Sequence, residues 1–197
     1  MSEIQTPYKE SARFLRFFRR IHRQVAIILF AFFFVVSLTG LILGWKKNSF
    51  GLILPESSTG RSSDIATWLP WDSLQTIAIH TLHNSVSPSL STKLERIDAR
   101  PQKGIVKFVF SDDYWEVQVD GMTGKVLLVD QRHSDIIENI HDGTILDVLF
   151  NTKDDQFKLS YTSIMGSALL MLIITGGWLW YGPKKMRRKK HLGIHPK

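Results

Sequence analysis

Cysteine is absent from this sequence of 197 residues, so disulfide bonds, thiol chemistry and iron–sulfur ligation are excluded. The hydrolase patterns His-Glu-x-x-His and Gly-x-Ser-x-Gly are absent too. No flavin or nicotinamide motif occurs, so a redox role would need a separate electron donor. Charged side chains are missing from two long stretches, residues 25–45 and 159–181, which contain 21 and 23 residues.

The two uncharged stretches are predicted to be transmembrane helices. A helix crosses the hydrocarbon core of a bilayer with about 20 apolar residues. At a rise of about 1.5 Å per residue, the first stretch is roughly 32 Å long. Two buried core helices of a soluble protein are the alternative. Trp45, Trp178, Trp180 and Tyr181 lie at the ends of the stretches, as aromatic residues do at membrane interfaces.

Charge is distributed in a way that predicts the orientation of the helices. Residues 1–24 have six basic and two acidic side chains, net +4, and residues 182–197 have seven basic and no acidic ones, net +7. Residues 46–160 have twelve basic and sixteen acidic side chains, net −4. Because basic flanks stay in the cytoplasm, we expect both termini there and residues 46–158 on the outer, periplasmic side of a bacterial inner membrane. The basic tail is expected to contact lipid head groups, and no nucleic-acid partner is predicted.

The segment between the two stretches has the pattern of a small α+β unit. A helix is predicted in "PWDSLQTIAIHTLHNSV", and four short strands follow, with turns at "SDDY" and "DGMTGK". Trp115, Val117 and Val119 alternate with polar residues, so we expect an amphipathic sheet that one helix can cover. The segment "SDIIENIHDGTILDVLF" is too short for a membrane span and is predicted to form an interfacial helix and loop.

The predicted fold class is therefore a membrane α-helical hairpin of two transmembrane helices with an inserted extracytoplasmic α+β domain, one helix on a small antiparallel sheet. An inserted domain of this size is marginally stable alone, so its attachment to the membrane helices or to a partner is expected. The predicted parts are a basic N-terminus (1–24), a transmembrane helix (25–45), a linker (46–67), the α+β domain (68–132), an interfacial helix and loop (133–158), a second transmembrane helix (159–181) and a basic tail (182–197).

Four segments occur in an order that carries a family resemblance: "RRIHRQVAIILFAFFFVVSLTGLIL", "DGMTGKVL", "ENIHDGTILD" and "ITGGWLWYGPKK". Together they resemble the PepSY-associated transmembrane family. The matching positions are Thr39-Gly40, Thr123-Gly124, His141-Asp142-Gly143, Trp178 and Trp180, and the resemblance spans roughly residues 13–190. Larger relatives have four helices and more than one PepSY unit, so this chain is similar to a compact half with one PepSY-like domain.

The family resemblance implies an inner-membrane location and, in many members, an iron-uptake context. Some larger relatives are haem-containing reductases that act on ferric siderophores, whereas others have no assigned activity. The acidic outer segment does not favour attraction of anionic ferric siderophores.

His22 and His141 are the candidate cofactor-binding residues. By the predicted topology, His22 lies at the cytoplasmic mouth of the first helix and His141 on the outer side before the second. A neutral imidazole is a good axial haem ligand, and together with the resemblance this indicates haem b at both residues and no other metal. In a two-fold homodimer each histidine would face its symmetry mate. The alternatives are interfacial snorkelling for His22 and a favourable helix C-terminal position for His141.

The other five histidines are weaker candidates. His80 and His83 lie three residues apart on the predicted soluble helix, a spacing that can hold a metal, but no third ligand is evident nearby. His133 lies in a polar link and has no assigned role. His191 and His195 belong to the basic tail.

Two hypotheses of different classes follow. In the first, the protein is a haem-binding membrane component that passes electrons outward for ferric-chelate reduction, with a separate electron donor. In the second, it is a non-catalytic membrane anchor whose outer domain binds or regulates an envelope partner. The first would make the protein part of a haem-dependent membrane reductase, and no catalytic residue is assigned.

Overall fold

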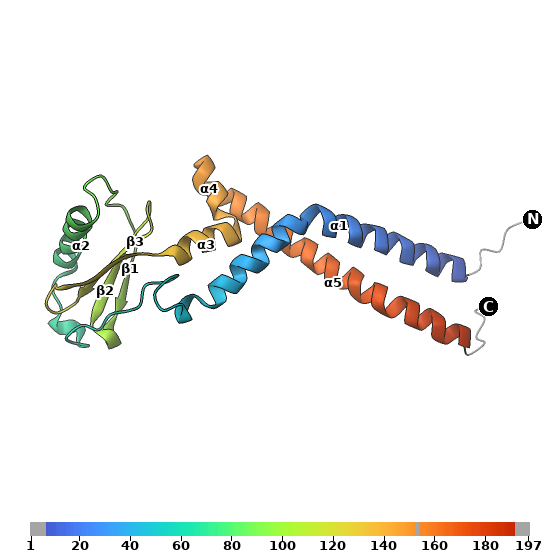
Figure 1. Ribbon diagram of the computed structural model, residues 1–197, viewed down its shortest axis with the longest axis horizontal. Coiled ribbons are helices and arrows are strands. Elements are labelled where there is room, and N and C mark those ends of the chain that lie inside the picture. The colour runs from blue at the N-terminus through green and yellow to red at the C-terminus, as the bar shows by residue number, and fades with distance from the viewer. Residues whose placement is uncertain (1–6, 153, 192–197) are drawn as a thin grey trace, which may run out of the picture. The chain divides into compact units, whose positions relative to one another are not determined.

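The computed structural model describes residues 7–152 and 154–191, which form two compact units (Figure 1). The first unit contains the described residues up to Leu38 and from Asp142 onward, and the second contains Thr39–His141. The helices are α1 (Pro7–Gly44), α2 (Trp71–Ser85), α3 (His133–Asp142), α4 (Thr144–Phe150) and α5 (Gln156–His191), and the strands are β1 (Leu94–Arg100), β2 (Ile105–Phe110), β3 (Trp115–Asp120) and β4 (Val126–Gln131).

The two long helices, α1 and α5, contain the predicted transmembrane stretches. Arg13–Gly44 and Gln156–Lys185 are long and apolar enough to cross a membrane, and only 6% and 17% of their most apolar windows are buried. So little burial contradicts the alternative of two core helices in a soluble protein. Both helices extend beyond the uncharged stretches: α1 begins at Pro7, a residue suited to the first helical turn, and continues through arginines, which are good helix formers.

In the first unit, α1 and α5 run antiparallel (Figure 1). The rings of Phe14 and Trp178 lie 6.2 Å apart near one end, and those of Phe32 and Tyr161 lie 6.2 Å apart further along. The least exposed residues of α5 recur every three or seven positions, which is the spacing of a helix–helix seam. They are Met165, Ala168, Thr175 and Gly182.

In the second unit, four antiparallel strands form a meander in the order β1-β2-β3-β4, and α2 covers one face (Figure 1). Val106 pairs with Val119 and Phe108 with Val117, so their side chains share the face toward α2. Leu74, Ala78 and Leu82, four residues apart on α2, are fully buried against this face. The predicted helix and four strands are thus present, and two apolar helices flank them in the sequence.

The opposite face of the sheet is polar but also buried, which differs from an amphipathic sheet covered by a single helix. Lys107, Glu116, Gln118 and Asp120 are each at most 5% exposed. Part of the predicted linker covers them: Ser58 N donates to Gln118 Oε1 at 2.8 Å, and Arg61 N donates to Asp120 Oδ2 at 2.8 Å. This segment lacks regular structure, as expected from its Ser, Gly and Pro content, yet it is an integral layer of the fold.

The predicted interfacial segment forms two short helices, α3 and α4. Gly143 separates them at φ +86°, and a Cβ there would come within 2.9 Å of the Tyr161 ring. In the first unit, α4 exposes Val148, Leu149 and Phe150 at 61–73%. Asp147 accepts the N–H groups of Phe157 and Lys158 at 3.0 and 2.7 Å, which caps the beginning of α5.

Candidate functional site

His22 lies on α1 and contacts a threonine of α5. Its Nδ1 lies 2.8 Å from Oγ1 of Thr175, although 153 residues separate the two in the sequence. Thr175 is 2% exposed, whereas His22 is half-buried. The predicted residue His22 therefore faces the seam between the two long helices and does not extend freely into water as an interfacial side chain would.

The hydrogen bonds of Thr175 assign the tautomer of His22. The Thr175 hydroxyl donates to the carbonyl oxygen of Met171 at 2.6 Å, and Leu172 O lies at 3.2 Å. A carbonyl can only accept, so the single hydroxyl hydrogen is used there. With the hydroxyl in this orientation, Oγ1 accepts from His22, which places a proton on Nδ1. In this tautomer the lone pair lies on Nε2, the nitrogen that can bind a metal.

His141 lies near the end of α3 and has an equivalent partner on α1. Its Nδ1 is 2.9 Å from Oγ1 of Thr39, which is 8% exposed. Helical threonine hydroxyls ordinarily donate to a carbonyl of the preceding turn, which leaves their lone pairs to accept from a neighbour. His141 thus shares with His22 an Nδ1 bound to a buried helical threonine. The two histidines belong to different units and contact different threonines.

A glycine follows each of the two threonines and lies against the imidazole edge. A Cβ built on Gly176 would lie 3.5 Å from His22 Cε1, and one built on Gly40 would lie 3.3 Å from His141 Cε1. Among the described residues, the imidazole is what each added methyl group would meet within 4 Å. The absence of a side chain therefore lets the ring approach the helix closely at both positions, most tightly at Gly40.

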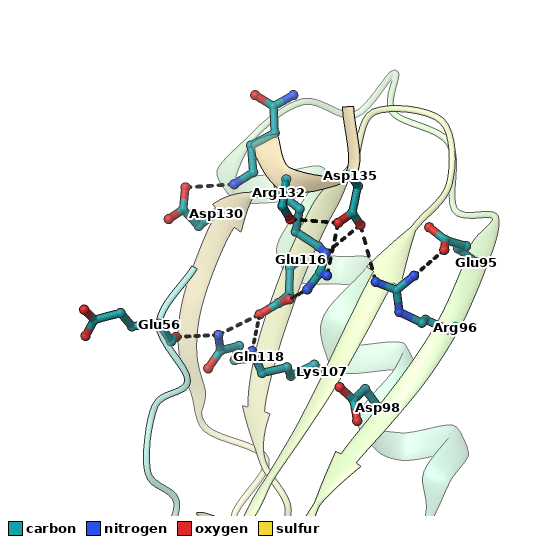
Figure 2. A network of polar contacts seen from close by, with 12 residues as sticks. Glu56, Glu95, Arg96, Asp98, Lys107, Glu116, Gln118, Asp130, Arg132 and Asp135 are labelled. Carbon is teal, nitrogen blue, oxygen red and sulfur yellow. Dashed lines mark hydrogen bonds and ion pairs between the residues drawn. The ribbon is translucent and has the colours of Figure 1, made fainter. Parts of the chain in front are cut away.

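A buried charge network attaches the beginning of α3 to the polar face of the sheet (Figure 2). Arg132 donates to both oxygens of Asp135, at 2.7 and 3.1 Å, and also pairs with the fully buried carboxylate of Glu116. Glu116 in turn accepts from Lys107 Nζ at 2.9 Å and from Gln118 Nε2 at 2.7 Å. Because α3 carries His141 at its other end, the network helps to fix where that imidazole lies.

The electrostatics of Asp135 show that this attachment is charged. Burial alone would raise the pKa of Asp135, but the hydrogen bonds and positive charge of Arg132, with further help from Ser134 and Arg96, lower the pKa below its usual value. Two contacts further along α3 add to the attachment: Asn139 Nδ2 donates to the Tyr114 hydroxyl at 2.9 Å, and Glu138 lies 3.6 Å from Lys46. Most of the length of α3 is therefore held within the second unit.

The residues that follow His141 have structural contacts of their own. Asp142 accepts the N–H of Thr144 at 3.0 Å and pairs with Lys158 at 2.9 Å. Burial raises the pKa of Asp142, but hydrogen bonds from Thr144 and Lys158 outweigh it, so the pKa lies below its ordinary value. Gly143 then supplies the positive φ described above. Of the three residues His141, Asp142 and Gly143, His141 is the one whose side chain offers a nitrogen that could bind a cofactor.

The remaining histidines that the structure describes do not gather into a metal site. Asn84 Nδ2 lies 3.1 Å from the ring nitrogens of His80, and His83 Nε2 lies 3.1 Å from the carbonyl oxygen of Leu90. His133 is exposed. The His191 side chain and all of His195 lie outside the described residues. Within residues 7–152 and 154–191, no three His, Cys, Asp or Glu side chains gather as metal ligands.

The donor chemistry of His22 and His141 fits haem better than a bare metal ion. A porphyrin supplies four equatorial nitrogens, so the protein provides only axial ligands. Axial histidines commonly donate their second ring N–H to an oxygen, which fixes the tautomer, and Thr175 and Thr39 are such acceptors. The surroundings of His22 also suit an apolar cofactor, because Phe18 and Trp178 line the same pair of helices.

The comparison with known families identifies the class of protein. The family described as PepSY-associated TM region matches residues 19–195, nearly the whole chain. The chain therefore belongs to this family, as the sequence segments predict. Together with two apolar helices, family membership indicates a membrane protein. No curated protein and no solved structure matches the chain.

Both histidines are predicted from the sequence, but their contacts with threonines are not. Thr39-Gly40 was noted as a family feature and Thr175-Gly176 as part of "ITGG", without any function. The signal that was available is repetition: a Thr-Gly dipeptide occurs once in each long apolar helix. Which histidine each dipeptide contacts depends on helix pairing, which one sequence does not reveal.

Proposed function

We propose that this chain binds haem b as a homodimer in the bacterial inner membrane and carries electrons outward for ferric-chelate reduction in iron uptake. The observation that carries the proposal is the shared geometry of His22 and His141, whose Nδ1 atoms are bound by threonine and whose Nε2 atoms are left to a metal. A haem with axial imidazoles takes up and releases one electron. The chain itself supplies these imidazoles and holds their tautomer and orientation.

The homodimer is proposed because each histidine supplies one imidazole, whereas low-spin haem takes two axial ligands. A symmetry-related copy would supply the second. On α5, Ser163, Gly166, Ser167 and Gly177 are exposed and so do not pack against α1. A Cβ built on Gly166 or Gly177 would meet no described atom within 4 Å beyond its chain neighbours and the backbone of its own helix. Small residues on an apolar helix allow a second helix to approach closely, which supports a contact between copies.

The proposed orientation places both termini in the cytoplasm. The beginning of α1 and the end of α5 lie at the same end of the helix pair (Figure 1), so a membrane-spanning pair would expose both basic flanks on one side. Basic flanks are retained in the cytoplasm. The sheet-containing unit, which we propose to be the PepSY module of the chain, would then lie outside.

The electron donor and acceptor are proposed to be separate partners. The sequence has no flavin or nicotinamide motif, so electrons must reach the protein from another molecule. Residues 46–160 have sixteen acidic and twelve basic side chains, so this segment does not attract an anionic ferric siderophore. A partner protein, or a chelate that is not anionic, is the acceptor that best fits this charge.

Visible spectroscopy of the purified full chain tests the proposal. Wild-type protein should show the bands of low-spin haem in oxidised and reduced states. His22→Ala and His141→Ala should each lose half of the haem, and the double variant should lose all of it. His80→Ala is a control on the exposed surface of α2 and should keep the wild-type spectrum.

A folded wild-type protein that takes up no haem would overturn the proposal. That result would favour the other class of function, a non-catalytic membrane anchor whose outer unit binds or regulates an envelope partner. Haem that stays bound in the double histidine variant would likewise show that other residues are the ligands.

A further inference from the structure

We infer that Thr39 and Thr175 are positioning residues that hold His141 and His22 in the one tautomer able to bind haem iron. The inference rests on the proposed function and deepens it. Both threonines are buried helical residues, at 8% and 2% exposure, and each lies within 2.9 Å of an imidazole Nδ1. A histidine that contacts a threonine and the glycine after it therefore occurs twice in the chain. His22 of α1 contacts α5, and His141 of α3 contacts α1.

The threonine hydroxyl determines which nitrogen of the ring has the proton. At Thr175 the hydroxyl hydrogen is directed to Met171 O at 2.6 Å, so Oγ1 presents lone pairs to His22. A ring with its proton on Nε2 could keep its contact with Oγ1 only if the hydroxyl rotated toward Nδ1 and gave up its bond to Met171 O. The bond to Met171 O thus favours the Nδ1–H form, which leaves Nε2 free of a proton. It also fixes the rotation of the ring.

A structural role in packing predicts a different response to mutation. Valine has nearly the volume and shape of threonine but has no hydrogen-bonding oxygen. If the threonines only fill space between helices, valine should leave the histidines unchanged. If they position the rings, valine should release Nδ1 while serine, which keeps the hydroxyl, should preserve it. Losing such an outer partner of a metal-binding histidine typically weakens metal affinity by about 10- to 100-fold.

The experiment uses full-length protein in detergent, labelled with ¹⁵N-histidine, first without cofactor and then titrated with haem. In the cofactor-free protein, Thr175→Val should shift the ¹⁵N signals of His22 away from the Nδ1–H form and leave those of His141 unchanged. Thr39→Val should do the reverse. Each valine variant should weaken haem binding at its own site by about 10- to 100-fold and change its midpoint potential. The serine variants should behave like wild type.

Thr81→Val is the matched control, because Thr81 is a helical threonine on α2 whose hydroxyl donates to Ile77 O at 2.7 Å. It should change neither the ¹⁵N signals of His22 and His141 nor haem binding. If wild type binds haem and both valine variants match it in tautomer and affinity, the positioning role is overturned while the proposed function stands. If wild type binds no haem, the proposed function fails and the ligand-positioning role fails with it.

Discussion

The two histidine–threonine pairs have the same local geometry but different supports. His22 and Thr175 join the two long helices, α1 and α5, and the rings of Phe18 and Trp178 on the same helices lie 6.4 Å apart. His141 lies on a ten-residue helix, α3, whose beginning is attached to a sheet by buried charges. One imidazole is thus held by apolar helix packing and the other by an ionic network.

This difference shows how the same histidine–threonine contact can be supported in two ways. Pairing of apolar helices needs no charges, and a hydroxyl bonded to its own helix adds little cost. A helix of ten residues is marginal by itself, so α3 needs tertiary contacts to stay in place. Arg132 and Asp135 provide them at its beginning, and Asn139 does so further along. The polar face of the sheet therefore helps to hold His141 in place.

The largest expected effect comes from breaking the network at Glu116. Glu116→Ala would leave Lys107 and Arg132 without the fully buried carboxylate that they share. Removing one partner of a buried ion pair typically costs about 3–5 kcal/mol. We expect hydrogen exchange of the sheet amides in the full chain to accelerate accordingly. The ¹⁵N signals of His141 should change, whereas those of His22 in the other unit should not.

A surface ion pair is the control for Glu116. Asp98 and Arg100 are paired at 2.6 Å with side-chain exposures of 31% and 54%. Exposed pairs of this kind contribute about 0–1 kcal/mol, so Asp98→Ala should have little effect on exchange. Equal exchange rates in the two variants would mean that the polar face of the sheet is solvated and does not support α3.

The sequence was informative where a pattern is local. Absence of charge located α1 and α5, alternation located β3, and the predicted positions of His22 and His141 at opposite edges of the membrane marked both as candidates. The burial of Glu116 was missed because alternation distinguishes two faces of a strand but does not tell whether a distant segment covers the polar one. The covering segment is the stretch predicted as a linker.

Contacts between residues that lie far apart in the sequence could not be predicted either. The contact of His22 with Thr175 joins residues 153 positions apart, and that of Thr39 with His141 joins residues 102 apart. Either threonine could equally serve helix packing when judged from its neighbours in the sequence. Helical periodicity also gave no signal for the start of α1 at Pro7, because its first turns are basic and have no uncharged stretch to mark them.

A smaller effect is expected when Asp135, which pairs with Arg132 at the beginning of α3, is protonated in acid. The folded pKa of Asp135 is lowered, so its charge stabilises the second unit above the unfolded carboxyl value of about 3.9. This contribution is lost as the pH falls through the folded pKa, in the range below about pH 4. We expect exchange protection of α3 to fall there. Asp135→Asn should already be less protected at neutral pH and should approach wild type in acid.

The His22–Thr175 contact is the internal reference for this titration. Its support comes from apolar helices, and no carboxylate takes part in the hydrogen bond. Exchange protection of α1 and α5 near these residues should therefore change less across the same pH range. An equal loss of protection in both units would argue against Asp135 as the source of the acid response.

The smallest effect should come from adding one methyl group beside each imidazole. In Gly40→Ala the new Cβ would lie 3.3 Å from His141 Cε1, so the ring must move by a few tenths of an ångström and its bond to Thr39 should weaken. In Gly176→Ala the distance to His22 Cε1 is 3.5 Å, an ordinary contact. Alanine also favours a helix over glycine by about 0.5–1 kcal/mol, so this variant should be neutral or slightly stabilising.

Measuring the ¹⁵N signals and haem midpoint potentials of both variants would separate the two sites. Gly40→Ala should shift the signals and potential of the His141 site alone, whereas Gly176→Ala should leave both sites as in wild type. A difference of 0.2 Å in clearance is small, so the test depends on how firmly each ring is held. If both variants respond alike, the two imidazoles are equally free to adjust. In that case the ionic attachment of α3 adds no rigidity at His141 beyond what apolar packing gives His22.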